Sequence, residues 1–214
     1  QGYTGSACSN VVDEYSTNLT RTTGTNLSLA RRYIAATTVG DYALFGGGYT
    51  TIAGTNSYSG VVDAYYTNLA RSTPASFNIS KGNHAATTVG DYALFGGGYT
   101  ANSASSWLDI YNTSLTHDYT SLDTPRYQFT ATTVGNYALL GGGRGSSGYT
   151  GIVEAIDTSL THTTPISLSS PRGMLVATTV GNYALFAGGY RGSVSKVVDA
   201  YDASLTRTTA TSLS

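Results

Sequence analysis

The chain has 214 residues and a formal net charge of −1, from 11 basic and 12 acidic residues. This balance gives no electrostatic basis for binding nucleic acid or an anionic membrane surface. No apolar run approaches the roughly 20 residues that span a bilayer, and the single cysteine, Cys8, excludes an internal disulfide and a multi-cysteine metal site. Thr (34), Ser (25), Gly (26) and Tyr (18) dominate the composition, which favours strands and turns over helices.

Two segments recur along the whole chain. Residues 36–48 read Ala-Thr-Thr-Val-Gly-Asp-Tyr-Ala-Leu-Phe-Gly-Gly-Gly, and close copies begin at Ala86, Ala131 and Ala177, in steps of 50, 45 and 46 residues. The second segment pairs apolar residues with an acid, and its copies begin at Val11, Val61, Trp107, Ile152 and Val197. The spacing varies almost entirely between the Gly run and the second segment, which indicates a surface loop at that point.

Each repeat predicts four short strands. In the first full repeat we expect strands over 36–39 and 42–45, joined by a tight turn at Gly40-Asp41. A third strand over 61–65 follows the variable loop, and a polar fourth strand rich in Thr, Ser and Arg ends the repeat. Both faces of the second strand are apolar, which predicts a sheet covered on both sides.

Radial stacking of such sheets accounts for these features, so we expect an all-β propeller of four-stranded antiparallel blades. The Ala-Thr-Thr strands are expected to be innermost, and the side chains of Leu44, Phe45, Leu94 and Phe95 are expected to be buried between blades. The single repeat domain, 1–214, then divides into an outer half-blade (third and fourth strands) over 1–30 and four full blades over 31–80, 81–125, 126–171 and 172–214.

The order of residues within the repeat resembles the kelch repeat, and the resemblance covers nearly the whole chain. The matching positions are Arg31, Ala36, Gly40, Tyr42, Gly46, Gly47, Val12, Asp13 and Tyr15. The resemblance implies a β-propeller of four-stranded blades. One departure is the fourth strand, which reads Thr-Arg-Thr-Thr at 206–209 and lacks the kelch tryptophan, while Trp107 lies in a third strand. We therefore expect lighter packing in the outer layer.

The register leaves the half-blade without its first two strands. The hairpin over 11–28 then presents an open inner edge, and the apolar face of the last blade around 184–186 lacks a following blade. We expect flanking polypeptide or another copy of the chain to complete the ring. Residues 1–9 lack the pattern of a signal peptide, and the scarcity of Lys beside abundant hydroxyls favours an extracellular or surface-associated chain, with a cytoplasmic one as the alternative.

The titratable residues show no pattern typical of a catalytic or metal site. His84 begins a first strand, whereas His117 and His162 lie at the start of fourth strands, so the three are not expected to converge on a metal. The Tyr/His/Cys set of a kelch-like copper oxidase and the boxes of sialidase-type propellers are missing from the sequence. We expect no catalytic residue, no metal and no cofactor. A structural role is expected for the acid that recurs in every repeat, namely Asp13, Asp63, Asp109, Glu154 and Asp199.

The candidate binding residues fall into two groups. A cation precedes the first strand of each full blade, at Arg31, Lys81, Arg126 and Arg172. The variable loops contribute a second group, Tyr49, Tyr58, Tyr99, Tyr149, Tyr190 and Arg191, among Ser, Gly and Asn, a composition typical of recognition loops. For the cations two hypotheses stay open. They form a ring that attracts a carboxylate or sulfate, or each is neutralised by a third-strand acid such as Asp63.

These observations favour a non-catalytic interaction module, in which a rigid propeller displays variable loops toward a protein or a glycan. The alternative is a structural building block of a surface or virion-like assembly, which the close similarity of the repeats favours. A propeller oxidase or hydrolase is the least favoured hypothesis.

Overall fold

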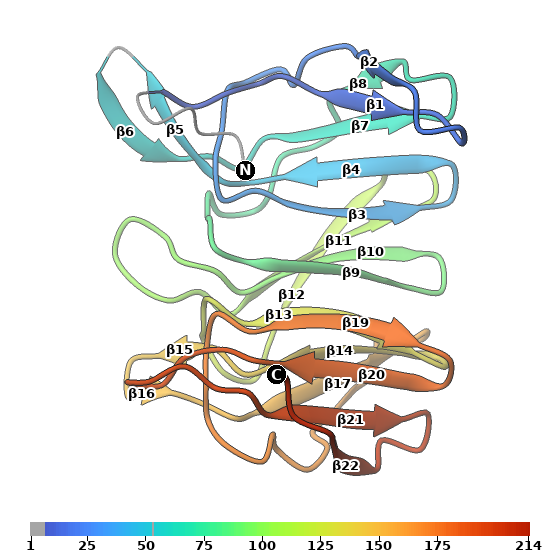
Figure 1. Ribbon diagram of the computed structural model, residues 1–214. Helices are drawn as coiled ribbons and strands as arrows, with labels where there is room; N and C mark the ends of the chain where they lie inside the picture. The colour runs from blue at the N-terminus through green and yellow to red at the C-terminus, as the bar shows by residue number, and fades with distance from the viewer. Residues whose placement is uncertain (1–6, 53) are drawn as a thin grey trace.

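The computed structural model describes residues 7–52 and 54–214. In this part of the chain all helices and strands assigned are β-strands, with no helix among them (Figure 1). None of it forms a helix long and apolar enough to cross a membrane. Four four-stranded antiparallel sheets follow one another along the described chain, as the sequence predicts, and we number them sheets 1 to 4.

Within each sheet the strands lie in chain order, each pairing with the next. Sheet 1 consists of β3 (Ala35–Val39), β4 (Tyr42–Gly46), β7 (Val62–Tyr66) and β8 (Arg71–Ser72). Sheet 2 consists of β9 (Ala85–Val89), β10 (Tyr92–Gly96), β11 (Trp107–Asn112) and β12 (His117–Ser121). Sheet 3 consists of β13 (Thr130–Val134), β14 (Tyr137–Gly141), β17 (Val153–Asp157) and β18 (His162–Thr163). Sheet 4 consists of β19 (Val176–Val180), β20 (Tyr183–Ala187), β21 (Val198–Asp202) and β22 (Arg207–Ala210).

Three two-stranded sheets complete the secondary structure of the described residues. The first, β1 (Asp13–Tyr15) with β2 (Arg21–Thr23), precedes sheet 1, and among the described strands β1 pairs only with β2. The others, β5 (Tyr49–Ile52) with β6 (Thr55–Tyr58) and β15 (Arg144–Gly145) with β16 (Gly148–Tyr149), lie in the variable connections of sheets 1 and 3. Sequence analysis expected plain loops there, because these short polar runs lack the alternation of a half-buried strand.

The Ala-Thr-Thr strands β3, β9, β13 and β19 lie at one edge of each sheet and pack against one another in series. Their threonine hydroxyls pair across adjacent sheets, with Oγ1 atoms 2.7 Å apart for Thr37 and Thr88 and 3.0 Å apart for Thr87 and Thr133. Small side chains let the strands approach closely, and the hydroxyls satisfy one another at the contact. The prediction that these strands lie together at one edge of their sheets is confirmed.

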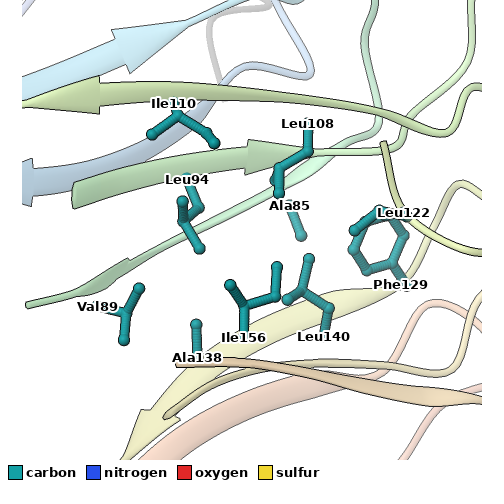
Figure 2. Packing of buried hydrophobic residues seen from close by; sticks show 10 residues of the cluster. All are labelled: Ala85, Val89, Leu94, Leu108, Ile110, Leu122, Phe129, Ala138, Leu140 and Ile156. Atoms are coloured by element: carbon teal, nitrogen blue, oxygen red, sulfur yellow. The ribbon is translucent and has the colours of Figure 1, made fainter. Parts of the chain in front are cut away.

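The second strand of each sheet contributes buried apolar side chains to both faces of that sheet. In sheet 2, Leu94 packs toward sheet 3 among Leu108, Ala138 and Ile156, as Figure 2 shows. Its neighbour Phe95 packs toward sheet 1 in the cluster that contains Leu44. Because Cβ atoms alternate along a strand, consecutive residues fill the two intersheet layers. The predicted burial of Leu44, Leu94 and Phe95 is confirmed.

Phe45 departs from this prediction, since it is only half-buried, whereas Phe95 and Phe186 are fully buried. The phenylalanine of a second strand faces the preceding sheet, as the contact of Phe95 with Gly46 shows. In the part of the chain that the structure describes, the sheet that precedes Phe45 consists of β1 and β2. Two strands cover less of its ring than four.

The last sheet has one open apolar face. The sequence predicts this open face around Ala184 to Phe186. The prediction is wrong for the side chains of Ala184 and Phe186, because both are fully buried in the cluster against sheet 3. Leu185 points to the opposite side, where it lines a hollow of about 590 Å³ with Val176 and Leu213. Sheets 1 to 3 bury the equivalent face against the next sheet.

Candidate binding face

One end of the sheets gathers the variable connections. We call this end the loop face; it comprises the links from second to third strands (47–61, 97–106, 142–152 and 188–197) and the segments before the first strands (24–34, 73–84, 122–129 and 164–175). The hairpins β5–β6 and β15–β16 project from it at the left of Figure 1. The opposite end holds tight turns such as that between β3 and β4.

The four repeat cations do not lie exposed on this face. Their side chains are at most 1% exposed, and each pairs with the third-strand acid of its own sheet. The nitrogen–oxygen distances are 2.5 Å for Arg31–Asp63, 2.8 Å for Lys81–Asp109, 2.5 Å for Arg126–Glu154 and 2.9 Å for Arg172–Asp199. Of the two hypotheses, neutralisation by a third-strand acid therefore fits the structure, and an exposed cation ring does not.

These ion pairs hold the loop face to the sheets. Lys81 Nζ donates to the carbonyls of Phe95 (3.0 Å) and Trp107 (2.7 Å), where the connection leaves β10 and enters β11. Asp109 in turn accepts a bond from the backbone N–H of Asn78 at 2.7 Å. The same backbone donor recurs at Ser28, Asp123 and Ser169, which confirms the structural role expected for the acids of the four full sheets.

Burial lowers the pKa of Arg31, Lys81 and Arg126, and the paired carboxylates partly oppose this shift. Desolvation favours the neutral form of a base, while an adjacent negative charge favours the protonated form. The ammonium of Lys81 is the least basic of the three in its ordinary state. Its charge therefore depends most directly on Asp109.

His84 is buried, and its ring packs edge-on against Phe77, with ring centroids 5.4 Å apart. Desolvation, aided by the positive charge of Lys81, lowers its pKa to about 3. The equivalent positions in the other sheets hold Ile34, Phe129 and Leu175. His84 is thus a neutral core residue rather than a ligand.

Replacing His84 with Phe is expected to remove an acid-sensitive contribution to stability. The folded chain keeps His84 neutral down to about pH 3, whereas the unfolded chain protonates it near pH 6.5. The free energy of unfolding therefore falls as the pH drops below 6.5, by about 2.5 kcal/mol between pH 7 and 4.5. Urea unfolding at both pH values should show a smaller loss for His84→Phe than for the wild type. Equal losses would contradict the assignment.

The loop face carries a row of partly exposed tyrosines, which we call the tyrosine row: Tyr49, Tyr58, Tyr99 and Tyr127. Successive ring centroids lie 5.2, 6.4 and 5.0 Å apart. The Arg32 guanidinium lies 4.9 Å from the Tyr49 ring and extends the row. Spacings of this size are typical of interacting aromatic pairs, so the rings support one another in fixed positions.

Short backbone bridges position these residues. The residue after each buried cation pairs with the residue after the Gly run, as Gly82 does with Tyr99 and Tyr127 with Arg144. Arg32, Tyr127 and Arg144 were not among the predicted binding residues, which comprised the cation before each first strand, the loop tyrosines and Arg191. Alignment of the repeats offers the signal for Arg144, which occupies the position of Tyr49, Tyr99 and Tyr190.

A groove of about 800 Å³ lies between the connections of sheets 2 and 3, and we call it the loop groove. Tyr99, Tyr127 and Tyr149 supply aromatic surface, with Pro125 beside them and Arg144 as the charged residue. Its polar lining is Asn102, Ser103, Thr124, Ser146, Ser147 and Thr150. The volume is typical of small-molecule sites, which span roughly 300–1,000 Å³.

The remaining candidates lie beside this groove. Tyr190 lies 6.1 Å from Tyr149, centroid to centroid, and is partly exposed in the connection of sheet 4. Arg191 is exposed in the turn that follows. The structure thus brings Tyr49, Tyr58 and Tyr99 into one row and places Tyr149 and Tyr190 in a second group.

No protein-family model matches the chain, and comparison with curated proteins finds no significant match. The case for function therefore depends on the geometry and chemistry of the loop face.

Proposed function

We propose that sheets 1 to 4 are blades of a kelch-like β-propeller and that the chain is a non-catalytic interaction module. Four repeated antiparallel sheets, packed in series through their first strands, are consistent with this architecture. The kelch-like pattern of glycines, aromatic residues and acids supports it. The chain binds a glycan or a protein surface at its loop face. It is extracellular or surface-associated.

The observation that carries this proposal is the loop groove with the tyrosine row at its side. Aromatic rings offer flat apolar faces to a sugar ring or an apolar side chain. The hydroxyl and amide groups of Asn102, Ser103 and Ser146 supply the hydrogen bonds that orient a polar ligand. Of the two ligand classes, this mixture of rings and neutral polar groups favours a glycan.

The lining of the groove also supports binding without catalysis. Among the described residues, those that line it include no carboxylate, histidine, lysine or cysteine. Glycoside hydrolysis ordinarily requires a pair of carboxylates across the scissile bond. Arg144 is the charged residue of the groove, and its role there is to contact an acidic or hydroxylated ligand.

Replacing Tyr127 or Tyr99 with Ala is expected to weaken glycan binding by at least tenfold, since each removes a ring that lines the groove. The measurement is a glycan-array screen of the wild type, followed by titration of the best ligand against each variant. Tyr66→Ala is the matched control, because Tyr66 pairs with Tyr42 (centroids 5.2 Å apart) at the opposite end of sheet 1. A ligand whose affinity is unchanged in both groove variants would contradict the proposed face.

A structural building block is the second candidate. The apolar hollow on sheet 4 and the edge of β1 that pairs with none of the described strands favour it, since such surfaces recruit another strand or sheet. Flanking polypeptide or another copy of the chain would then complete the ring. Absence of any ligand in the glycan-array screen and in a matching screen of host-surface proteins would make this candidate the better one.

A further inference from the structure

We propose a divalent metal site on sheet 3, formed by Asp123, Glu154 and His162. One ligand atom from each of these side chains lies within 4.8 Å of the other two. Asp123 lies in the segment before β13, Glu154 lies in β17 and His162 begins β18. Sequence analysis expected no metal site, because it compared the histidines with one another and not with the acids of neighbouring strands.

Comparison of the repeats shows that this cluster is particular to sheet 3. The equivalent trios are Ser28, Asp63 and Arg71 in sheet 1, Asn78, Asp109 and His117 in sheet 2, and Ser169, Asp199 and Arg207 in sheet 4. Among the described residues, sheet 3 alone has an Asp, Glu or His side chain at all three positions. In sheets 1, 2 and 4 the three positions hold a neutral side chain, an acid and a basic side chain. In sheet 3 they hold two acids and a histidine.

The net charge around these three positions is positive in sheet 4 and negative in sheet 3. In sheet 4, Asp199 lies between two arginines, Arg172 at 2.9 Å and Arg207 at 3.3 Å, which leaves one positive charge. In sheet 3, Arg126 neutralises Glu154, and the exposed carboxylate of Asp123 adds a negative charge. A cation is therefore attracted to this position in sheet 3 and repelled from it in sheet 4.

Two of the three ligand side chains reach solvent, whereas Glu154 is fully buried. Glu154 uses Oε1 for Arg126, at 2.5 Å, while its Oε2 lies 3.9 Å from His162 Nδ1. Oε2 also accepts the Asp123 backbone N–H at 3.0 Å, which fixes Asp123 beside it. His162 is 21% exposed and Asp123 is exposed, so an ion can enter from solvent.

One imidazole nitrogen and two carboxylate oxygens form a donor set that suits Zn²⁺, which binds such ligands at about 2.0–2.2 Å and takes four. Ca²⁺ prefers six to eight oxygens and fits this set poorly. A bound ion would lie beside Glu154, as the guanidinium groups of Arg71 and Arg207 lie beside the equivalent acids of sheets 1 and 4. It would also anchor the segment that leads to Pro125 and Tyr127 in the wall of the loop groove.

The test is isothermal titration of the whole chain with Zn²⁺, with Ca²⁺ as a second probe. We expect one Zn²⁺ per chain, and at least tenfold weaker binding for Asp123→Asn and His162→Arg. His162→Arg introduces the residue that sheets 1 and 4 tolerate at this position, so folding is retained and circular dichroism verifies it. The matched control, His117→Arg in sheet 2, should bind Zn²⁺ as the wild type does.

Three results would overturn the site. The first is unchanged Zn²⁺ affinity in His162→Arg, and the second is an equal loss in His117→Arg, which would show binding by surface histidines in general. The third is a wild-type chain that binds no Zn²⁺ or binds Ca²⁺ more tightly. None of these readouts depends on a glycan ligand, so the metal site and the proposed function fail or stand separately.

Discussion

Replacing Arg126 with Met is expected to lower the free energy of unfolding by about 3–5 kcal/mol. The substitution keeps an unbranched apolar stem but leaves Glu154, which is fully buried, without the cation 2.5 Å away. It also removes the donor to the carbonyl of Leu140 at the end of β14. An uncompensated buried carboxylate is among the most costly groups in a protein interior. Denaturant unfolding monitored by circular dichroism measures the loss.

A second variant separates charge from packing. In Arg126→Met/Glu154→Gln the carboxylate becomes a neutral amide that still accepts the Asp123 backbone N–H. We expect the double variant to recover about 2 kcal/mol or more of the loss, because the buried charge is gone. A double variant no more stable than Arg126→Met would show that the arginine acts through packing and carbonyl contacts alone.

Replacing Phe95 with Ala is expected to cost about 3–5 kcal/mol, the usual loss for a fully buried aromatic side chain. The Phe95 ring lies 5.2 Å from Phe77 and 6.0 Å from Tyr111, between centroids, in the layer between sheets 1 and 2. Phe45→Ala is the matched control at the same position of sheet 1. It is expected to cost about 1–2 kcal/mol, because Phe45 is only half-buried. Equal losses in the two variants would contradict the claim that β1 and β2 cover Phe45 incompletely.

The four strands of each sheet and the cover on both faces of the second strand follow from the sequence, because apolar residues on both faces of a five-residue strand require neighbours on both sides. The half-exposure of Phe45 does not follow from its own repeat, which matches that of Phe95 residue for residue around the strand. It depends on how many strands precede it. Local pattern predicts a strand, whereas burial is decided by the neighbouring sheet.

The candidate site was harder to predict. Sequence spacing places Arg31 before a first strand but does not decide whether its side chain faces solvent or Asp63, which lies 32 residues later. The proposed metal ligands are also far apart in sequence, since Asp123 and His162 meet only when the segment before β13 folds against sheet 3. Alignment of the four repeats, position by position, could have indicated the recurring cation–acid pairs and the three ligand-type residues of sheet 3.

The repeats also divide the chain into constant and variable parts. The ion pairs and glycines that fix the connections recur in sheets 1 to 4 and lie inside the fold. Many of the residues that vary, such as Arg144 in place of Tyr99, are exposed or partly exposed on the loop face. A scaffold of this kind lets the surface change with little effect on folding, which is the arrangement expected of a recognition module.

The most direct test of the proposed recognition face is hydroxyl-radical footprinting of the wild-type chain, with and without the best glycan from the array. Mass spectrometry then reports the oxidation of individual tyrosines at the two ends of the sheets. Protection of Tyr58, Tyr99 and Tyr127, with unchanged oxidation of Tyr42 and Tyr66, is the result we predict. Protection of Tyr42 and Tyr66, with none on the tyrosine row, would contradict it.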